Sequence, residues 1–264
     1  MNGAIKYALL VPCYNAEKYI DGFIANISQL VRPFDEVIFY DDASTDDTFE
    51  ILSAKGLNVI KGAVNKGPGF ARNQLANAAT GDYIHFHDID DLLHPKYLQK
   101  TAKIAENNGA DVILCNVVWQ KPRSGETILA WNYSNREINK APLAYTIANP
   151  IGGINGLYRK RKFIETGGFN TEIRIWEDAD IHVRLAAKEA SFFIIEEVLA
   201  YSIRYADTAS ADQTSAWIIR AKLLQSYAGT FKQKDAMIAI GRQAQLVASQ
   251  LIMLRLFDLA KNCL

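Results

Sequence analysis

Short apolar segments that each lead into a polar cluster and then into a helix-type pattern dominate the first half of this chain. The four segments are Tyr7–Val11, Glu36–Tyr40, Leu57–Ile60 and Tyr83–Phe86. Strands that alternate with helices predict a parallel sheet, because each helix carries the chain back to the edge at which the previous strand began. We therefore predict an α/β fold with a mostly parallel, doubly wound sheet and helices on both of its faces.

Helix signals separate these strands. Apolar residues recur at helical spacing between Ala16 and Leu30. Another helix is predicted to begin at Pro68, where proline suits the first helical position, and to run to about Ala79. Pro95 opens a further helix. Each step is the strand–helix unit from which a parallel sheet is built.

The pattern is less regular after a further apolar strand at Asp111–Trp119. Gln120–Asn149 is rich in Pro, Asn, Ser and Lys, and we expect it to form surface loops. The remaining predicted elements are helices at Lys160–Thr166 and Trp176–Lys188 and closing strands at Phe192–Ile195 and Leu199–Arg204. From about Thr214 the pattern is helical to the last residue, and the final part of it is strongly apolar.

Charge and cysteine content exclude several classes of partner. The 29 basic and 29 acidic residues give a formal net charge of zero, so no global field recruits nucleic acid or an anionic membrane. The cysteines are Cys13, Cys115 and Cys263, an odd number without CxxC spacing, which argues against a disulfide framework and a structural zinc site. The N-terminal apolar run is too short for a membrane span and lacks a signal-peptide cleavage site. We expect a cytoplasmic protein that does not bind nucleic acid.

Polar clusters follow the predicted strands at the points where the strands end. They are Tyr14-Asn15, Asp41-Asp42, Asn65-Lys66 and Asp88 to Asp91. In open α/β sheets ligands bind outside the carboxyl ends of the strands, so these four separate segments are predicted to converge on one ligand-binding edge.

Asp88, Asp90 and Asp91 form the densest of these clusters. Three carboxylates this close repel one another beside an apolar strand and favour a bound cation. Oxygen ligands select Mg²⁺ or Mn²⁺, and a metal held by one or two carboxylates keeps positions for diphosphate oxygens. The alternative is a solvated acidic turn that caps the helix at Pro95.

The other clusters offer groups that bind a nucleotide. Asp41 or Asp42 can accept hydrogen bonds from a base or a ribose, although the run from Asp41 to Asp47 can instead cap the next helix. Tyr14 can stack on a base or simply pack. Arg72 can address a phosphate or form a surface salt bridge, and its place at the third glycine position of a dinucleotide fingerprint makes that fingerprint fail.

Glu177 and Asp178 stand at the predicted start of a helix, directly after Trp176. A carboxylate there can act as general base toward a hydroxyl group. Acids at a helix N-terminus are also favourable for purely electrostatic reasons. Histidines add little, since His85 and His87 share one face of a strand and are expected to pack in the core.

In order along the chain, these motifs resemble the family 2 glycosyltransferases of GT-A fold, from about Tyr7 to about Ala211. The motifs are Val11-Pro12-Cys13-Tyr14-Asn15, Asp41-Asp42-Ala43-Ser44-Thr45-Asp46, Asn65-Lys66-Gly67 with Ala71-Arg72-Asn73, Gly81-Asp82-Tyr83-Ile84, Asp88-Ile89-Asp90-Asp91 with Pro95, Gly167-Gly168-Phe169, and Trp176-Glu177-Asp178 with Arg184. The ordered set, rather than any one motif, carries the resemblance.

The resemblance implies an inverting enzyme that uses a nucleoside-diphosphate sugar, with a UDP-sugar as the favoured donor and a glycan or lipid-linked saccharide as acceptor. Pro12, Tyr14 and Asp42 would line the base pocket, and Asp88 would meet the ribose. Asp90, with Asp88 and Asp91 beside it, would hold Mn²⁺ or Mg²⁺. Asp178 would be the base.

The same resemblance divides the chain. Residues 1–213 would form the GT-A domain, with a nucleotide-sugar-binding half at 1–118 and an acceptor-side half at 119–213. Residues 214–264 would form a C-terminal helical extension. Many relatives carry a histidine shortly after the arginine that ends the last core strand, here Arg204. This chain has none there, and Asp207 is the candidate substitute for that metal ligand.

Two rival functions and the role of the extension remain open at this point. A haloacid-dehalogenase-like phosphotransferase would use Asp88 as its nucleophile, and a non-catalytic protein on the same fold would only bind the sugar nucleotide. The C-terminal helices are expected to pack on the domain. Homodimerisation and peripheral contact with the inner face of a membrane are the alternatives.

Overall fold

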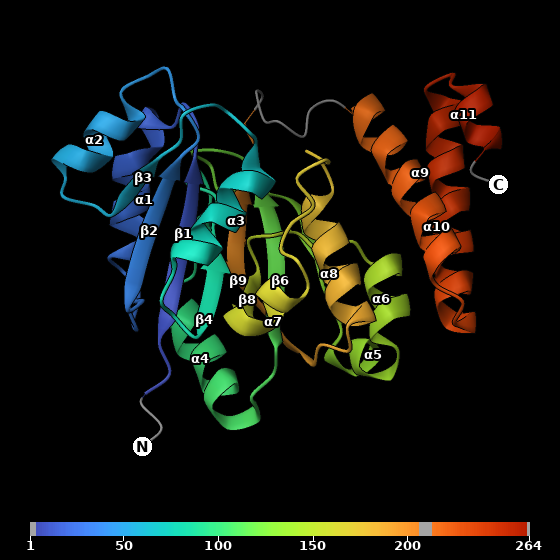
Figure 1. The fold of residues 1–264 in the computed structure, drawn as a ribbon, viewed down its shortest axis with the longest axis horizontal. Helices are drawn as coiled ribbons and strands as arrows, with labels where there is room; N and C mark the ends of the chain where they lie inside the picture. The colour runs from blue at the N-terminus through green and yellow to red at the C-terminus, as the bar shows by residue number, and fades with distance from the viewer. Residues whose placement is uncertain (1–3, 206–212, 263–264) are drawn as a thin grey trace.

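The computed structural model describes residues 4–205 and 213–262. Within them the strands form one nine-stranded sheet with helices on both faces, and a group of C-terminal helices stands beside it (Figure 1). The strands are β1 (Tyr7–Cys13), β2 (Glu36–Asp41), β3 (Val59–Lys61), β4 (Tyr83–Phe86), β5 (Leu92–Leu93), β6 (Val112–Gln120), β7 (Thr127–Trp131), β8 (Gly156–Arg159) and β9 (Phe192–Ile203).

Helices connect most of the strands. They are the 3-10 helix η1 (Glu17–Tyr19) and the α-helices α1 (Ile20–Ile27), α2 (Thr48–Ala54), α3 (Pro68–Ala78), α4 (Tyr97–Asn108), α5 (Asn135–Lys140), α6 (Pro142–Ala148), α7 (Lys160–Glu165), α8 (Glu177–Ala187), α9 (Gln213–Thr230), α10 (Lys234–Met253) and α11 (Phe257–Lys261). The alternation of strand and helix in the first half is the one that the sequence predicts.

The strand order is β3-β2-β1-β4-β8-β6-β9-β5, with β7 paired to β6. β1 to β4 run parallel to one another, β6 and β9 are parallel, and β8 is antiparallel to both of its neighbours. β1 lies between β2 and β4, so the chain first moves to one side of β1 and then returns to the other. Such a reversal is a topological switch point, where open α/β sheets form ligand crevices.

Both faces of the sheet are covered, which explains why its strands are continuous apolar runs. Leu9 and Val11 pack with α1 and α4 on one face, while Ala8 and Leu10 pack with α3 on the other, and all four are fully buried. Side chains alternate between the faces of a strand, so a strand buried on both faces cannot alternate apolar with polar residues. The predicted mostly parallel, doubly wound sheet is confirmed.

Three local predictions were wrong. Gln120–Asn149 contains β7, α5 and α6 rather than loops alone, and Ser134 Oγ accepts from the backbone N–H of Glu137 at the start of α5. This Ser-x-x-Glu spacing is a helix-start signal that the polar composition masked. Phe192–Ile195 and most of Leu199–Arg204 belong to one strand, β9, which ends at Ile203 and absorbs register shifts against β6. The helix expected from Ala16 to Leu30 is limited to η1 and α1.

The C-terminal helices pack onto α6 and α8. Ile147 of α6 and Val183 of α8 share an apolar cluster with Leu224, Val247 and Leu251 of the extension, and all five are buried. The expected packing on the domain is therefore present. Among the helices of the described ranges, none combines the length and apolar content that a membrane crossing requires.

Two glycines test how tightly this sheet is assembled. A Cβ on Gly81, just before β4, would lie 2.9 Å from the backbone nitrogen of Ala8, whereas a Cβ on Gly22, inside α1, would meet nothing within 4 Å. We predict that Gly81→Ala lowers the free energy of unfolding by about 1–3 kcal/mol, because backbone must move. Gly22→Ala should raise it by up to about 1 kcal/mol through helix propensity. Urea denaturation measures the unfolding free energy of both variants. Equal changes in the two would contradict the close packing of backbone around Gly81.

Candidate functional site

Side-chain hydrogen bonds join the loops that follow β1 and β2 at the switch point. The backbone N–H of Asn15 donates to Ser44 Oγ at 2.9 Å, and Asn15 Oδ1 accepts from the backbone N–H of Thr45 at 2.8 Å. Asn15 adopts a φ of +49°, which asparagine tolerates better than most residues. Pro12 is half-buried, and the Tyr14 side chain, 50% exposed, leaves its ring available to a ligand. Asn15 therefore shapes the edge, while Tyr14 faces outward.

Asp41 and Asp42 are buried, and both hold loops. Asp41 accepts from the backbone N–H of Ser44, at 3.3 Å to the nearer oxygen. Asp42 accepts from the backbone N–H groups of Lys66 and Gly67, at 3.0 and 2.7 Å to the nearer oxygen in each case. Helix α2 begins later, at Thr48, so this pair does not act as its cap. Asp42 thus fixes the β3–α3 loop, whose residues 65 and 66 are predicted binding residues.

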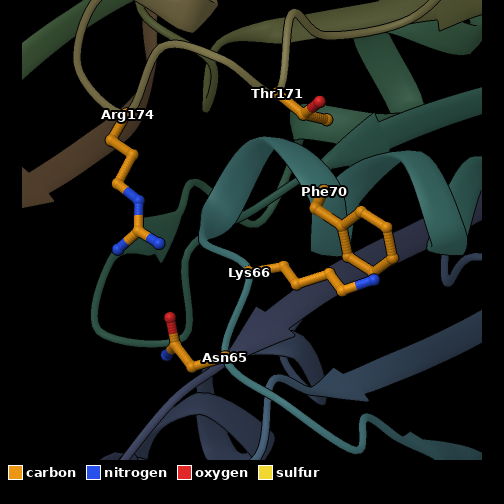
Figure 2. A pocket seen from close by; sticks show the side chains of 5 residues that line it. All are labelled: Asn65, Lys66, Phe70, Thr171 and Arg174. Atoms are coloured by element: carbon orange, nitrogen blue, oxygen red, sulfur yellow. The ribbon is translucent and has the colours of Figure 1, made fainter.

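A cleft of about 430 Å³ opens beside this loop, between it and the segment that precedes α8 (Figure 2). Its lining residues are Asn65, Lys66, Phe70, Thr171 and Arg174. Lys66 Nζ lies 4.5 Å from the centre of the Phe70 ring, and the Arg174 side chain points toward the loop from the opposite side. Both cations are exposed, and within the described ranges neither forms an ion pair closer than 4 Å. The cleft therefore presents two uncompensated positive charges.

Sequence reasoning missed Thr171 and Arg174. They lie far along the chain from Asn65 and Lys66, and nothing in their local pattern marks them as binding residues. Only the folded chain brings the loop after Gly167-Gly168-Phe169 against the N-terminus of α3, where Arg174 packs on Gly67.

Arg72 lies inside the site rather than on its surface. Its guanidinium donates from Nη2 to Asp88 Oδ1 at 2.7 Å and from Nη1 to Glu177 Oε1 at 2.8 Å, and its side chain is only 7% exposed. The two acceptors come from the loop after β4 and from the first turn of α8. One buried arginine thus ties the two halves of the site together, and the alternative of a surface salt bridge does not describe it.

Asp88, Asp90 and Asp91 occupy three different environments. Burial opposes ionisation of Asp88, but the charge and hydrogen bond of Arg72 outweigh it and lower the pKa of this carboxyl. Burial and repulsion from Asp88 raise the pKa of Asp90 to about 6. Burial also raises the pKa of Asp91, whose Oδ1 accepts from the backbone N–H of Ile203 at 2.7 Å. Asp91 is therefore engaged with β9, while Asp88 and Asp90 keep partial exposure.

The arrangement of these acids tests whether the site could hold the predicted Mg²⁺ or Mn²⁺ ion. Among residues 4–205 and 213–262, no three His, Cys, Asp or Glu side chains are arranged to hold an ion. Two partly exposed carboxylates, Asp88 and Asp90, match a Mg²⁺ or Mn²⁺ ion that takes its remaining ligands from water and substrate phosphates. Repulsion between them raises the pKa of Asp90, and a cation would relieve that repulsion. The residues present thus fit a metal that is completed by its substrate.

The first turn of α8 holds three acids, and only one of them lacks an ion pair. Glu177 pairs with Arg72, and Asp180 pairs with Arg184 at 2.6 Å. In the described part of the chain Asp178 has no ion pair, and its Oδ1 accepts from the backbone N–H of Ala179 at 2.7 Å. Burial, opposed by the charge of Arg72, raises the pKa of Asp178. Asp178 is therefore the acid of this turn with free capacity to take a proton.

Two glycines flank Asp178. A Cβ on Gly152 would lie 3.8 Å from Asp178 Oδ2, and a Cβ on Gly153 would lie 3.6 Å from its Cβ. The backbone of both glycines therefore lies against Asp178, and a hydrogen bond from the backbone of Gly153 is one of the contacts that lower the pKa of this carboxyl.

The remaining predicted positions have structural partners or fall outside the described ranges. His85 and His87 are fully buried and in contact with each other, at 3.3 Å between His85 Nε2 and His87 Nδ1, as expected for core residues. Arg204 stacks on Trp119, 3.6 Å from the ring centre. Asp207, the candidate substitute for a metal ligand, lies outside the described residues.

Comparisons with known proteins bear on the family and the fold of this chain. The model of the family described as glycosyl transferase family 2 matches residues 8–167. An uncharacterized glycosyltransferase of Haemophilus influenzae is 28% identical over 199 residues, which cover 74% of this chain and 67% of that protein. The poly(ribitol-phosphate) β-N-acetylglucosaminyltransferase TarS of Staphylococcus aureus is 32% identical over 117 residues, 42% of this chain but only 20% of TarS.

Solved structures show the same fold. TarS residues 1–349 in complex with UDP-GlcNAc superpose with a TM-score of 0.65 at 21% identity, covering 94% of this chain and 72% of that one. A mannosyltransferase of Pyrobaculum calidifontis in complex with GDP-mannose and Mn²⁺ superposes with a TM-score of 0.67 at 19% identity, covering 99% and 74%. The GT-A fold with its C-terminal helices is thereby confirmed.

Glu177 gives a stability prediction. Burial and repulsion from Asp178, opposed by Arg72, raise the pKa of Glu177 to about 7. The folded state then holds a proton that the unfolded state releases near its ordinary pKa, so stability falls as pH rises from about 4.5 to about 7. We expect the difference in unfolding free energy between wild type and Glu177→Gln to fall by about 2–3 kcal/mol over this interval.

Urea denaturation across the pH range measures this difference. Glu172→Gln makes the same chemical change at an exposed position in the preceding loop and should follow the wild-type curve. A wild-type minus Glu177→Gln difference that does not vary with pH would contradict the raised pKa.

Proposed function

Because the chain belongs to glycosyl transferase family 2, we propose that it transfers a sugar from a nucleoside-diphosphate sugar to a hydroxyl group of a saccharide acceptor, with inversion at the anomeric carbon. The observation that carries the proposal is Asp178, the acid in the first turn of α8 that forms no ion pair within the described ranges. It lies near Arg72, which bonds both Asp88 and Glu177. A donor bound at Asp88 would therefore lie close to Asp178, because Arg72 links Asp88 to the first turn of α8.

The donor binds along the edge formed by the loops after β1, β2, β3 and β4. Tyr14 supplies an exposed ring for the base, and the buried carboxylates of Asp41 and Asp42 hold the loops around it. Lys66 and Arg174 face the cleft with uncompensated charge, which favours an anionic ligand such as a nucleoside diphosphate. UDP-GlcNAc is the first donor to test and GDP-mannose the second, since structures of relatives contain them.

Chemistry at the acceptor requires a base, and Asp178 fills that role. Its carboxylate takes the proton of the acceptor hydroxyl while the acceptor oxygen forms a bond to the anomeric carbon. The bond from that carbon to the diphosphate oxygen breaks, and the electron pair leaves with the nucleoside diphosphate. One displacement inverts the configuration. Because Asp178 keeps partial exposure, an acceptor can reach its carboxylate.

Asp88 and Asp90 would hold a divalent ion, and Asp91 would support their loop through β9. When bound, Mn²⁺ or Mg²⁺ supplies positive charge that stabilises the departing diphosphate. Glu177 holds Arg72 in place and does not itself take the acceptor proton, so the base role falls to Asp178 alone.

The rival functions fit the site less well. A phosphotransferase that uses Asp88 as nucleophile expects its aspartate motif near the start of the domain, whereas three strand–helix units precede Asp88. A protein that only binds the sugar nucleotide would have no use for a partly buried carboxylate that forms no ion pair in the described part of the chain, since burial raises the pKa of Asp178 and opposes its ionisation.

Replacing the base tests the proposal. Asp178→Asn should lower the turnover of UDP-GlcNAc or GDP-mannose by about 10²–10⁴-fold, because general base catalysis contributes on that scale. The affinity for UDP should stay within about twofold of wild type, since Asp178 does not contact the donor edge. Nucleoside-diphosphate release and calorimetric titration measure the two quantities.

Glu172→Gln is the matched control for this experiment, because it changes an exposed acid of the same segment to its amide. It should leave turnover and UDP affinity unchanged. Unaltered turnover in Asp178→Asn would remove Asp178 from the role of base, and no turnover by the wild-type chain with either donor would favour the purely binding function.

Metal removal gives a second test that does not depend on turnover. UDP should raise the melting temperature more in Mn²⁺ than in EDTA, because binding to the native state stabilises it. Asp90→Asn should abolish the extra shift and weaken UDP binding in Mn²⁺ by on the order of tenfold or more. Asp21→Asn, at a carboxylate 86% exposed in α1, should keep the wild-type response. A manganese effect that survives Asp90→Asn would falsify the ligand assignment.

A further inference from the structure

Trp176, the residue before Glu177 and Asp178, has a backbone conformation that bulky residues rarely adopt. Its φ is +73°, in the left-handed region, and it forms the N-terminal boundary of α8. Such a conformation persists only where surrounding contacts impose it, and it occurs most often at functional sites. The contacts that impose it here therefore also set where α8 begins.

Those contacts come from α9, the first helix of the C-terminal extension. Trp176 Nε1 donates to the backbone carbonyl of Ala216 at 2.7 Å, and the Trp217 ring centre lies 6.2 Å from that of Trp176. The guanidinium of Arg220 lies 5.3 Å from the centre of the Trp176 ring. Helix α9 thus holds Trp176 by a hydrogen bond, a ring contact and a cation.

A second set of contacts from α9 reaches the acids of α8. Tyr227 Oη donates to Asp180 Oδ1 at 2.9 Å, on the opposite carboxylate oxygen from the one that pairs with Arg184. This bond is fully buried. Because Asp180 lies in the same helical turn as Asp178, it fixes that turn as well as its own side chain.

Arg220 is the unusual member of this group. It is only 1% exposed, and its Nη2 donates to the backbone carbonyl of Ile147 at 2.8 Å. Its Nε and Nη1 have no hydrogen-bond partner in the described part of the chain. A buried cation with two unused donors costs stability unless negative charge lies near, and Asp178 and Asp180 are the nearby charges that favour its ionised form.

From these contacts we infer that α9 helps to build the catalytic site: Arg220 and Tyr227 of α9 are positioning residues that set the first turn of α8, and with it Asp178. The inference rests on the proposed function. It assigns a role to residues outside the matched range 8–167. It also assigns the extension a task besides packing.

Substitutions in full-length protein test the inference by steady-state kinetics with UDP-GlcNAc, or GDP-mannose if that is the donor used. Arg220→Met and Tyr227→Phe should each lower kcat by about tenfold or more and leave the KM for the donor within about twofold, because in the described part of the chain neither side chain hydrogen-bonds the loops that form the donor edge. Arg220→Lys keeps the buried charge and should recover most of the lost kcat.

Leu251→Ala is the control for loss of stability alone. Leu251 is fully buried in α10 and belongs to the same apolar cluster, and no hydrogen bond joins its side chain to α8. It should lower the melting temperature at least as much as Tyr227→Phe while kcat, measured well below both melting temperatures, stays near wild type. Losses of kcat that simply follow melting temperature across all variants would overturn the inference.

Hydrogen exchange provides a readout that is independent of turnover. Amides of residues 177–180 should exchange faster in Arg220→Met and Tyr227→Phe than in wild type, and at the wild-type rate in Leu251→Ala. Unchanged exchange in the first two variants overturns the positioning role. A wild-type chain with no turnover, but with the expected exchange pattern, contradicts the proposed function and leaves the structural coupling standing.

Discussion

The buried guanidinium of Arg72 is the interaction on which the rest of the site depends. It bonds Asp88 from the loop after β4 and Glu177 from α8, two segments that are separated along the chain by most of the second half of the sheet. Breaking a buried pair of this kind leaves an uncompensated charge and typically costs about 3–5 kcal/mol. Because one cation serves both acids, the loop after β4 and the start of α8 cannot move apart without breaking one of its bonds.

Charge compensation around α8 follows from that arrangement. Three acids within one helical turn repel one another, and the helix dipole offsets only a small part of this repulsion. Arg72 arrives from α3 and Arg184 from α8 itself, and each takes one acid. Arg220 arrives from α9 without contacting a carboxylate. The acid that remains unpaired is Asp178, so its chemical availability results from how the others are neutralised.

Much of the fold could be predicted from sequence, because the features that predict it involve residues close together along the chain. Each strand of the first half is a continuous apolar run that ends in a polar cluster, and both features depend only on neighbouring residues. The convergence of those clusters on one edge also followed, because parallel strands end on the same side. The error at Gln120–Asn149 arose where polar composition outweighed a helix-start signal at Ser134 and Glu137.

The contacts inside the site could not be predicted in the same way. Asp42 follows its strand as expected, yet its role of holding the backbone of Lys66 and Gly67 depends on how two loops meet. Asp90 and Asp91 are both aspartates, but Asp91 accepts a hydrogen bond from the backbone N–H of Ile203. The sequence does not show this contact. No sequence pattern relates Arg174 to Lys66, although both line the same cleft. Such partners come from tertiary packing, which spacing along the chain does not encode.

The arginines and lysines of the site divide into two groups by burial, and this division separates structure from recognition. Arg72 and Arg220 are buried, and Arg184 is partly buried. Arg72 pairs with Asp88 and Glu177, and Arg184 pairs with Asp180. Lys66 and Arg174 are exposed across a cleft and pair with no carboxylate in the described ranges. A chain whose total charge is zero can therefore still favour an anionic ligand locally, because two exposed cations face the same cleft.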